Sequence, residues 1–157
     1  MTAGTDKPGV IAPPPLLFAA AVAIGFAVDR WIIPLGFGLP GGLRLGLAGL
    51  LAVAALALAA AAIRLFGRAG THVEQWKPAT ALVTGGIYAR TRNPMYLAMA
   101  LLQAAIALGF DSVPVLAMLV PLLPVIRYGV IGREERYLAA KFPAEYPEYR
   151  RRVRRWL

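Results

Sequence analysis

The chain has 157 residues, 59% of them hydrophobic, and a net charge of +9 from 17 Lys and Arg against 8 Asp and Glu. Because it has no cysteine and one histidine, His72, disulfides, a cysteine nucleophile and a Cys/His metal site are excluded, and we expect no bound metal. The apolar residues form long blocks between short charged stretches. This pattern predicts a membrane protein whose basic groups meet anionic lipid rather than nucleic acid.

The predicted fold is all-α and polytopic. The proline-rich residues 1–14 are expected to be a disordered lead-in, followed by a single membrane domain over 15–157. Four apolar segments of this domain approach the roughly 20 residues that a membrane-spanning helix needs. They run over 15–33, 42–66, 95–110 and 113–131.

The third and fourth segments are joined only by Asp111 and Ser112, which predicts a tight helical hairpin. Pro114, Pro121 and Pro124 follow, and a proline inside a helix removes a backbone hydrogen bond and kinks it. Such kinks serve either packing or a widened cavity for a lipid-like substrate, and the sequence leaves both open.

Charge predicts the orientation of the spans. Lys and Arg are concentrated in the 67–94 loop and after the fourth span, whereas the linkers 34–41 and 111–112 contain none. The positive-inside rule therefore predicts that both termini and the 67–94 loop are cytosolic.

Short amphipathic helices are predicted at the cytosolic face, over 132–141 and, after Pro143, over 144–154. The second has one aromatic and apolar face, so we expect it to lie on the membrane surface. This face consists of Tyr146, Tyr149, Val153 and, at the interface, Trp156.

Two polar and aromatic segments, 71–96 and 127–149, are predicted to meet at this face. In the first, Asn93 and Pro94 are typical of a helix start, where free N–H groups can bind a carboxylate. In the second, Glu134 and Glu135 are adjacent and point about 100° apart on a helix. One is expected to face inward, suited to a cationic ligand beside aromatic rings, and the other to pair with arginine. The residues alone leave open which is which.

These stretches resemble the isoprenylcysteine carboxyl methyltransferases and the small membrane phospholipid methyltransferases over roughly residues 64–157. The matching residues are Thr80-Ala-Leu-Val-Thr-Gly-Gly-Ile-Tyr88, Arg92-Asn-Pro-Met-Tyr96, Glu134, Glu135, Tyr137, Leu138, Phe142, Tyr146, Tyr149 and Val153. The resemblance implies a transmembrane bundle with a cytosolic S-adenosylmethionine pocket and no Rossmann sheet. The sequence agrees, since it has no strand–Gly-rich turn–helix pattern.

The resemblance also implies roles for single residues. It makes Glu134 the inward acid and leaves Glu135 to orient arginines. The implied cofactor-binding residues are Thr80, Ala81, Leu82, Val83, Tyr88, Asn93, Pro94, Met95, Tyr96 and Glu134. Arg92, Asn93 and Glu135 are candidates for a catalytic role, and Arg127 and Arg133 are candidates for substrate contact.

The chain departs from the eukaryotic prenylcysteine enzymes at three positions. Asn93 replaces a histidine, Val130 replaces a substrate-contacting arginine, and Pro143 replaces a glycine. The predicted function is a membrane S-adenosylmethionine-dependent methyltransferase acting on a lipophilic acceptor. An isoprenylcysteine-like carboxylate, a phospholipid amine and a small thiol remain open as acceptors. The alternative is a non-catalytic membrane protein that binds anionic lipid through its basic C-terminal tail, Arg150 to Arg155.

Overall fold

The computed structural model describes residues 6–74 and 77–156, and every regular element in that part of the chain is helical. In chain order the helices are α1 (Pro14–Trp31), α2 (Gly41–Arg68), the 3-10 helix η1 (Gly86–Ala89), α3 (Pro94–Gly109), α4 (Val113–Ala117), α5 (Leu119–Val125), the π-helix η2 (Ile126–Ile131), α6 (Gly132–Lys141) and α7 (Glu145–Arg152). The predicted all-α class is confirmed. Residues 1–5 of the expected lead-in lie outside the described residues.

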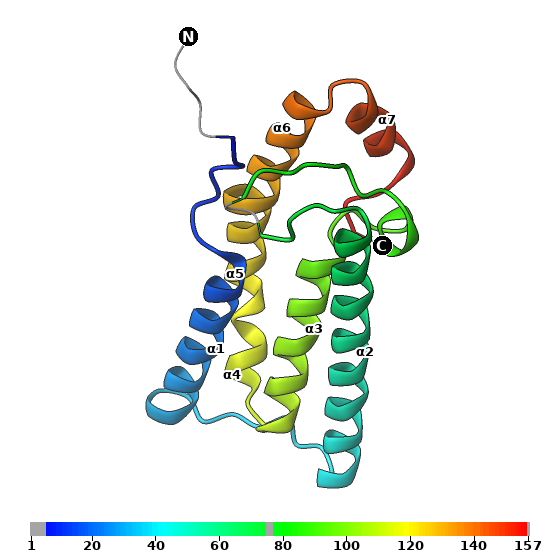
Figure 1. The fold of residues 1–157 in the computed structure, drawn as a ribbon. Helices are drawn as coiled ribbons and strands as arrows, with labels where there is room; N and C mark the ends of the chain where they lie inside the picture. The colour runs from blue at the N-terminus through cyan, green and yellow to red at the C-terminus, as the bar shows by residue number, and fades with distance from the viewer. Residues whose placement is uncertain (1–5, 75–76, 157) are drawn as a thin grey trace.

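Three helices are long and apolar enough to cross a membrane: α1, α2 and the nearly continuous helix that α4, α5, η2 and α6 form over Val113–Lys141. The fourth expected span, α3, has 16 residues, or about 24 Å of helix, which is less than the roughly 30 Å of a bilayer core. It lies within the bundle, against α2 on one side and against α1 and α4 on the other (Figure 1).

Small residues let α2 approach α3 closely. Ala48, Ala55 and Ala62 recur at intervals of seven and are the buried residues of α2. On α3, Ala98 and Ala105 are buried with the same spacing. In a bilayer, helix association depends on such close packing because lipid tails are as apolar as the side chains.

The α1–α4 contact depends on one glycine. A Cβ atom built on Gly25 would lie 2.6 Å from the Cα atom of Val115, closer than two carbon atoms can come without a shift. At the same end of the bundle, Ser112 accepts a hydrogen bond from the Val115 amide and caps α4. Arg44 of α2 donates to the last carbonyl groups of α3, at Leu108 and Gly109, and so ties α2 to the α3–α4 turn.

The prolines act in two ways. Pro114 lies in the first turn of α4, where a missing N–H costs nothing, so the expected kink at that position is wrong. Pro124 lies inside α5, and the helix widens to π geometry immediately after it, over Ile126–Ile131. Single π-turns within α-helices are frequent at functional sites.

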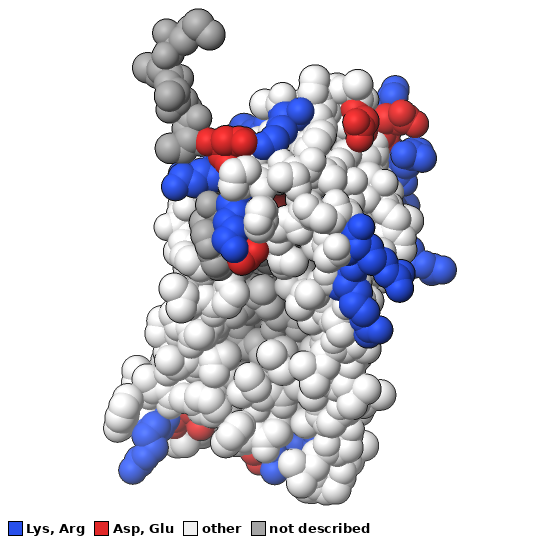
Figure 2. Space-filling model, in the orientation of Figure 1, with Lys and Arg blue, Asp and Glu red and all other residues white. Residues whose placement is uncertain are grey.

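The end of the bundle formed by the last turn of α2, the first turn of α3, α6 and α7 is called the polar end here. Figure 2 shows Lys and Arg gathered over it, above a largely uncharged surface. The aromatic face of α7 turns toward the protein, so its expected position on the membrane surface is wrong. Tyr146, Tyr149 and Val153 pack against Leu82, Leu138, Ala139 and Phe142.

Candidate functional site

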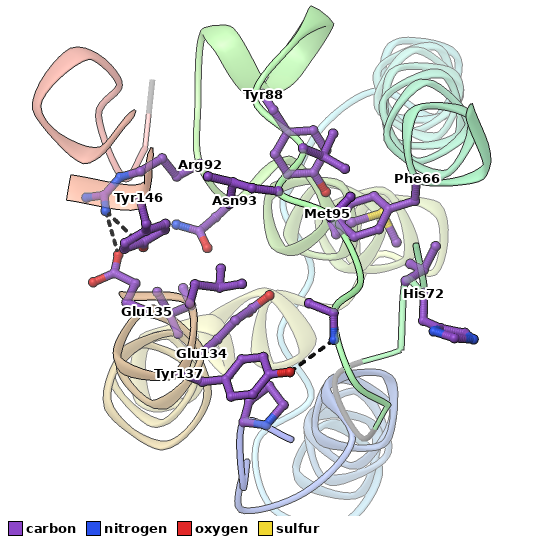
Figure 3. A pocket seen from close by; sticks show the side chains of 18 of the residues that line it. Phe66, His72, Tyr88, Arg92, Asn93, Met95, Glu134, Glu135, Tyr137 and Tyr146 are labelled. Carbon is purple, nitrogen blue, oxygen red and sulfur yellow. Dashed lines mark hydrogen bonds and ion pairs between the residues drawn. The ribbon is translucent and has the colours of Figure 1, made fainter. Parts of the chain in front are cut away.

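A cleft opens at the polar end, and its empty volume is about 870 Å³ when space open to the surroundings is included. Residues 72–74 and 77–83, η1, the first turn of α3 and α6 surround it, and Tyr146 and Tyr149 of α7 also line it. Figure 3 shows Tyr146 on the side of the cleft where Arg92 and Glu135 lie. Apolar and aromatic side chains line most of it, and a few charged groups point into it. This combination is typical of a small-molecule site.

An ion-pair network forms the wall beside α7. The Glu135 carboxylate pairs with Nη1 of Arg92 at 3.1 Å, and it accepts from Nε and Nη2 of Arg155 at 2.9 and 2.6 Å. The Arg92 and Glu135 side chains are only 10% and 11% exposed. This carboxylate also raises the pKa of Arg155. Because both Glu135 oxygens are engaged, Glu135 positions the two arginines.

Arg92 is incompletely satisfied by this network. Its Nη1 reaches Glu135 and, at 3.4 Å, the hydroxyl of Tyr146. Its Nε is buried and has no hydrogen-bond partner among the described residues. Since burying an unpaired donor costs about 1–3 kcal/mol, Arg92 keeps an unmet capacity for one further acceptor.

Glu134 lines the cleft from α6, next to this network. The Tyr96 hydroxyl of α3 donates to its Oε2 at 2.7 Å, so this contact joins two helices across the cleft. Tyr88 of η1 faces the same space and stacks edge-on against Phe66 at the end of α2, with ring centroids 5.5 Å apart. Burial, reinforced by Glu134, raises the pKa of Tyr88, which therefore stays a neutral hydroxyl donor at physiological pH.

Asn93 begins α3 as expected, but its side chain does not cap the helix. Instead Nδ2 donates to the carbonyl of Arg155 at 2.9 Å. Two neighbours bind the same C-terminal stretch: the Thr91 hydroxyl donates to the Arg155 carbonyl, and the Arg92 amide donates to the Arg154 carbonyl. Residues 91–93 thus hold the C-terminal segment against the cleft.

The loop before η1 is folded back on itself. The Thr71 hydroxyl accepts from the amides of Thr80 and Ala81, at 3.0 and 3.4 Å, and the Thr80 hydroxyl donates to the carbonyl of Gly70. The amides of two residues that the resemblance implies as cofactor-binding, Thr80 and Ala81, are therefore bound within the loop. Ala81, Leu82 and the next residue, Val83, still line the cleft.

An N-terminal strap, residues 6–11, lies along α6 and η2. The Asp6 carboxylate accepts from Lys141 and Tyr137, which lowers its pKa. The Tyr137 hydroxyl in turn accepts from the Ala79 amide at 3.0 Å. Arg133 donates to the carbonyl of Gly9 at 2.8 Å and is not among the residues that line the cleft, so its contact with substrate stays a prediction.

Most of the residues predicted from the sequence come together here. The cleft is lined by Ala81, Leu82, Val83, Tyr88, Arg92, Asn93, Met95, Tyr96, Glu134 and Glu135. Thr80 and Pro94 do not line it, and Arg127 lies in a separate groove.

Several residues that line the cleft could not be recognised as site residues from the sequence, because their position in the fold brings them there. Phe66 ends a long apolar helix, and Pro8 belongs to the strap, so both reach the cleft only through tertiary packing. Tyr137, Tyr146 and Tyr149 had a signal in the resemblance but no assigned role. His72 lies at the edge, and its ring is turned away from the center (Figure 3). No group of side chains that could hold a metal ion occurs among the described residues.

The fold and the cleft define an all-helical membrane protein with a candidate ligand site at the polar end of its bundle. Residues 43–145 match the phospholipid methyltransferase family, and the chain belongs to that family. Membership indicates a membrane methyltransferase and does not favour the non-catalytic alternative. An uncharacterized protein of Haemophilus influenzae is 42% identical over 64 residues, which are 40% of this chain and the whole of that protein. No solved structure matches the chain significantly.

Proposed function

We propose that the cleft binds S-adenosylmethionine and that the protein transfers its methyl group to a lipophilic acceptor. The observation that carries the proposal is the buried, unpaired Nε of Arg92 at a cleft that also presents a carboxyl group and several aromatic rings. The family match supports the methyl transfer.

The residues present fit the chemical groups of this cofactor. Its carboxylate would satisfy the Arg92 donor, which Glu135 holds in place. Its amino group or ribose hydroxyls would meet Glu134, and Tyr88 with Phe66 would offer ring faces to the adenine. The amides of Leu82 and Val83 are the remaining candidates in the loop for reading the adenine edge.

When bound, S-adenosylmethionine supplies an electrophilic methyl group on a positively charged sulfonium. What the chain itself contributes is position and exclusion of water. Tyr88 and Tyr96 are buried and form the apolar sides of the cleft, and the Tyr96–Glu134 hydrogen bond fixes the distance between α3 and α6. A carboxylate or thiolate acceptor needs no general base, whereas an amine acceptor has to lose a proton.

The proposal is tested by calorimetry with S-adenosylhomocysteine on the detergent-purified protein. We expect the wild type to bind, and Glu134→Gln to bind at least about tenfold more weakly because a charged contact is worth about 1.5–3 kcal/mol. Glu148→Gln is the matched control, since Glu148 is an exposed glutamate of α7 outside the cleft, and its affinity should equal that of the wild type. Absence of binding by the wild type would overturn the proposal.

A further inference from the structure

The N-terminal strap consists of a base that is fixed to the bundle and a tip that is held at the surface. In the base, Val10 is half-buried and packs against the apolar cluster that joins α1, α3, α5 and η2. The amide of the next residue, Ile11, donates to the Gly129 carbonyl at 3.3 Å. The Ile11 side chain lies so close to Gly129 that a Cβ atom would not fit there without a shift. Residues 10 and 11 therefore hold the base against η2.

The tip, residues 6–8, is attached to α6 by polar contacts. The Asp6 carboxylate accepts from Nζ of Lys141 at 2.6 Å and from the Tyr137 hydroxyl at 2.9 Å. The Asp6 side chain is 58% exposed and that of Lys141 is 26% exposed. An ion pair this accessible to water contributes little stability, because the solvent screens the attraction. The tip can therefore leave α6 at a small cost while the base stays in place.

Gly9 joins the tip to the base. Its φ of +61° lies in the left-handed region, which glycine adopts without steric cost and other residues adopt rarely. The surrounding space does not require a glycine, because a Cβ atom built there meets no atom of the described residues within 4 Å. The backbone conformation is therefore what favours glycine at this position. Hinges move a segment by changing φ and ψ at a few such residues, so Gly9 is the point about which the tip can turn.

The docked tip borders the cleft. Pro8, which lies between Asp6 and Gly9 in the chain, is one of the residues that line it. The Tyr137 hydroxyl that donates to Asp6 also accepts from the Ala79 amide at 3.0 Å (Figure 3), and Ala79 lines the cleft as well. The tip, α6 and the loop before η1 thus meet at one hydroxyl group. Release of the tip would take Pro8 away from the cleft and remove one of the contacts that hold this edge together.

We propose that the strap is a gate of the cofactor cleft. Its tip turns about Gly9 between the docked position, in which Pro8 closes one edge of the cleft, and an open position through which S-adenosylmethionine enters and S-adenosylhomocysteine leaves. The inference rests on the proposed function, and it adds the route by which the cofactor is exchanged. The strap precedes residues 43–145, the part of the chain that matches the family, so the gate does not follow from family membership.

The rates of ligand exchange test the gate, because a gate acts on passage in both directions. Weaker docking of the tip should raise the association and dissociation rate constants together and leave their ratio, the Kd, nearly unchanged. A strap that only formed part of the binding surface would instead raise the dissociation rate constant and the Kd. Tritiated S-adenosylhomocysteine and the detergent-purified full chain give both constants in a scintillation proximity assay. Association is followed at several ligand concentrations, and dissociation is followed after addition of excess unlabelled ligand.

Two substitutions weaken docking by different means, at the ion pair and at the hinge. Asp6→Asn and Gly9→Ala should each raise both rate constants about fivefold, while the Kd stays within about twofold of the wild type. Asp29→Asn and Gly38→Ala are the matched controls at the opposite end of the bundle. Asp29 is an aspartate that accepts from the Leu35 amide, and Gly38 has a φ of +67°. Both controls should exchange the ligand at wild-type rates.

A charge exchange shows that the ion pair itself holds the gate. Asp6→Lys and Lys141→Asp should each speed exchange, and the double variant should return toward wild-type rates because it restores the pair with its charges reversed. Unchanged rates in Asp6→Asn and Gly9→Ala, or a rise in the dissociation rate constant alone, would overturn the gate and leave the cofactor site standing. If the wild type binds no S-adenosylhomocysteine, the gate fails together with the proposed function.

Discussion

Glu135 binds two guanidinium groups with one carboxylate, and this makes it the most constrained charged residue of the site. Arg92 comes from the chain segment before α3 and Arg155 from the C-terminal segment, so one side chain joins three parts of the molecule. Removing the carboxylate would leave two cations close together with no partner. Most of the lost stability would come from the two buried guanidinium groups left without a partner, and less from the lost attraction itself.

We therefore predict that Glu135→Gln lowers the free energy of unfolding by about 3 kcal/mol, the lower end of the roughly 3–5 kcal/mol that removing one partner of a buried ion pair costs. Thermal unfolding in detergent micelles measures it. The control is Glu148→Gln, which removes a pair with Arg152 whose side chains are 59–66% exposed, and which should cost less than about 1 kcal/mol. Equal effects of the two substitutions would show that the Glu135 network contributes no more than a surface pair.

The adjacent glutamates also show what single residues in a sequence can and cannot predict. Their adjacency predicts that one faces a ligand and the other pairs with arginine. Both line the cleft, and arginines bind the Glu135 oxygens, whereas ligand contact by Glu134 stays a prediction. For Asn93, the sequence predicts the position but not the side-chain contact. Its position at the start of α3 follows from Pro94, but its hydrogen bond to the Arg155 carbonyl depends on a segment 62 residues away.

At the scale of elements, α2 and α3 show how composition determines packing. The seven-residue spacing of Ala48, Ala55 and Ala62 lies within a helix so rich in alanine and leucine that sequence alone did not single it out. Only the burial of these three shows which face of α2 meets its neighbour. Ala55 is 2% exposed, whereas Ala57, two positions on, is exposed.

This difference gives a paired prediction. Ala55→Leu should lower the thermal unfolding temperature, because extra methyl groups in a close-packed contact cost about 1–3 kcal/mol. Ala57→Leu makes the same chemical change on the exposed face and should leave the unfolding temperature unchanged. If both variants unfold at the wild-type temperature, α2 does not pack on α3 through this stripe.

The amphipathic helices show the limit of reasoning from periodicity. An aromatic face on α7 can be buried either in a membrane surface or against the protein, and the pattern is the same in both cases. The protein supplies a partner from Leu82 and α6, so the face is buried internally. The π geometry of η2 follows Pro124 of α5, and no periodicity in the sequence marks it.

At the scale of the whole molecule, charge divides the two ends of the bundle. Arg30 and Arg44 are the basic residues at the end opposite the cleft, and the rest of the 17 Lys and Arg are near or beyond the polar end. Figure 1 shows the described N-terminal strap and the C-terminal segment at that same end. The Asp6–Lys141 ion pair, with N to O at 2.6 Å, places the strap there independently of the picture.

This asymmetry yields a prediction about orientation. Basic residues near the ends of spans are retained in the cytosol, so the cleft and both termini should be cytosolic. A fluorescent protein fused to the C-terminus should then be bright, and alkaline phosphatase fused at the same position should be inactive. A control fusion after Pro40, in the linker between α1 and α2, should give the opposite pair of signals. Active phosphatase at the C-terminus would place the cleft outside the cytosol, where S-adenosylmethionine is not made, and would count against both the orientation and the proposed function.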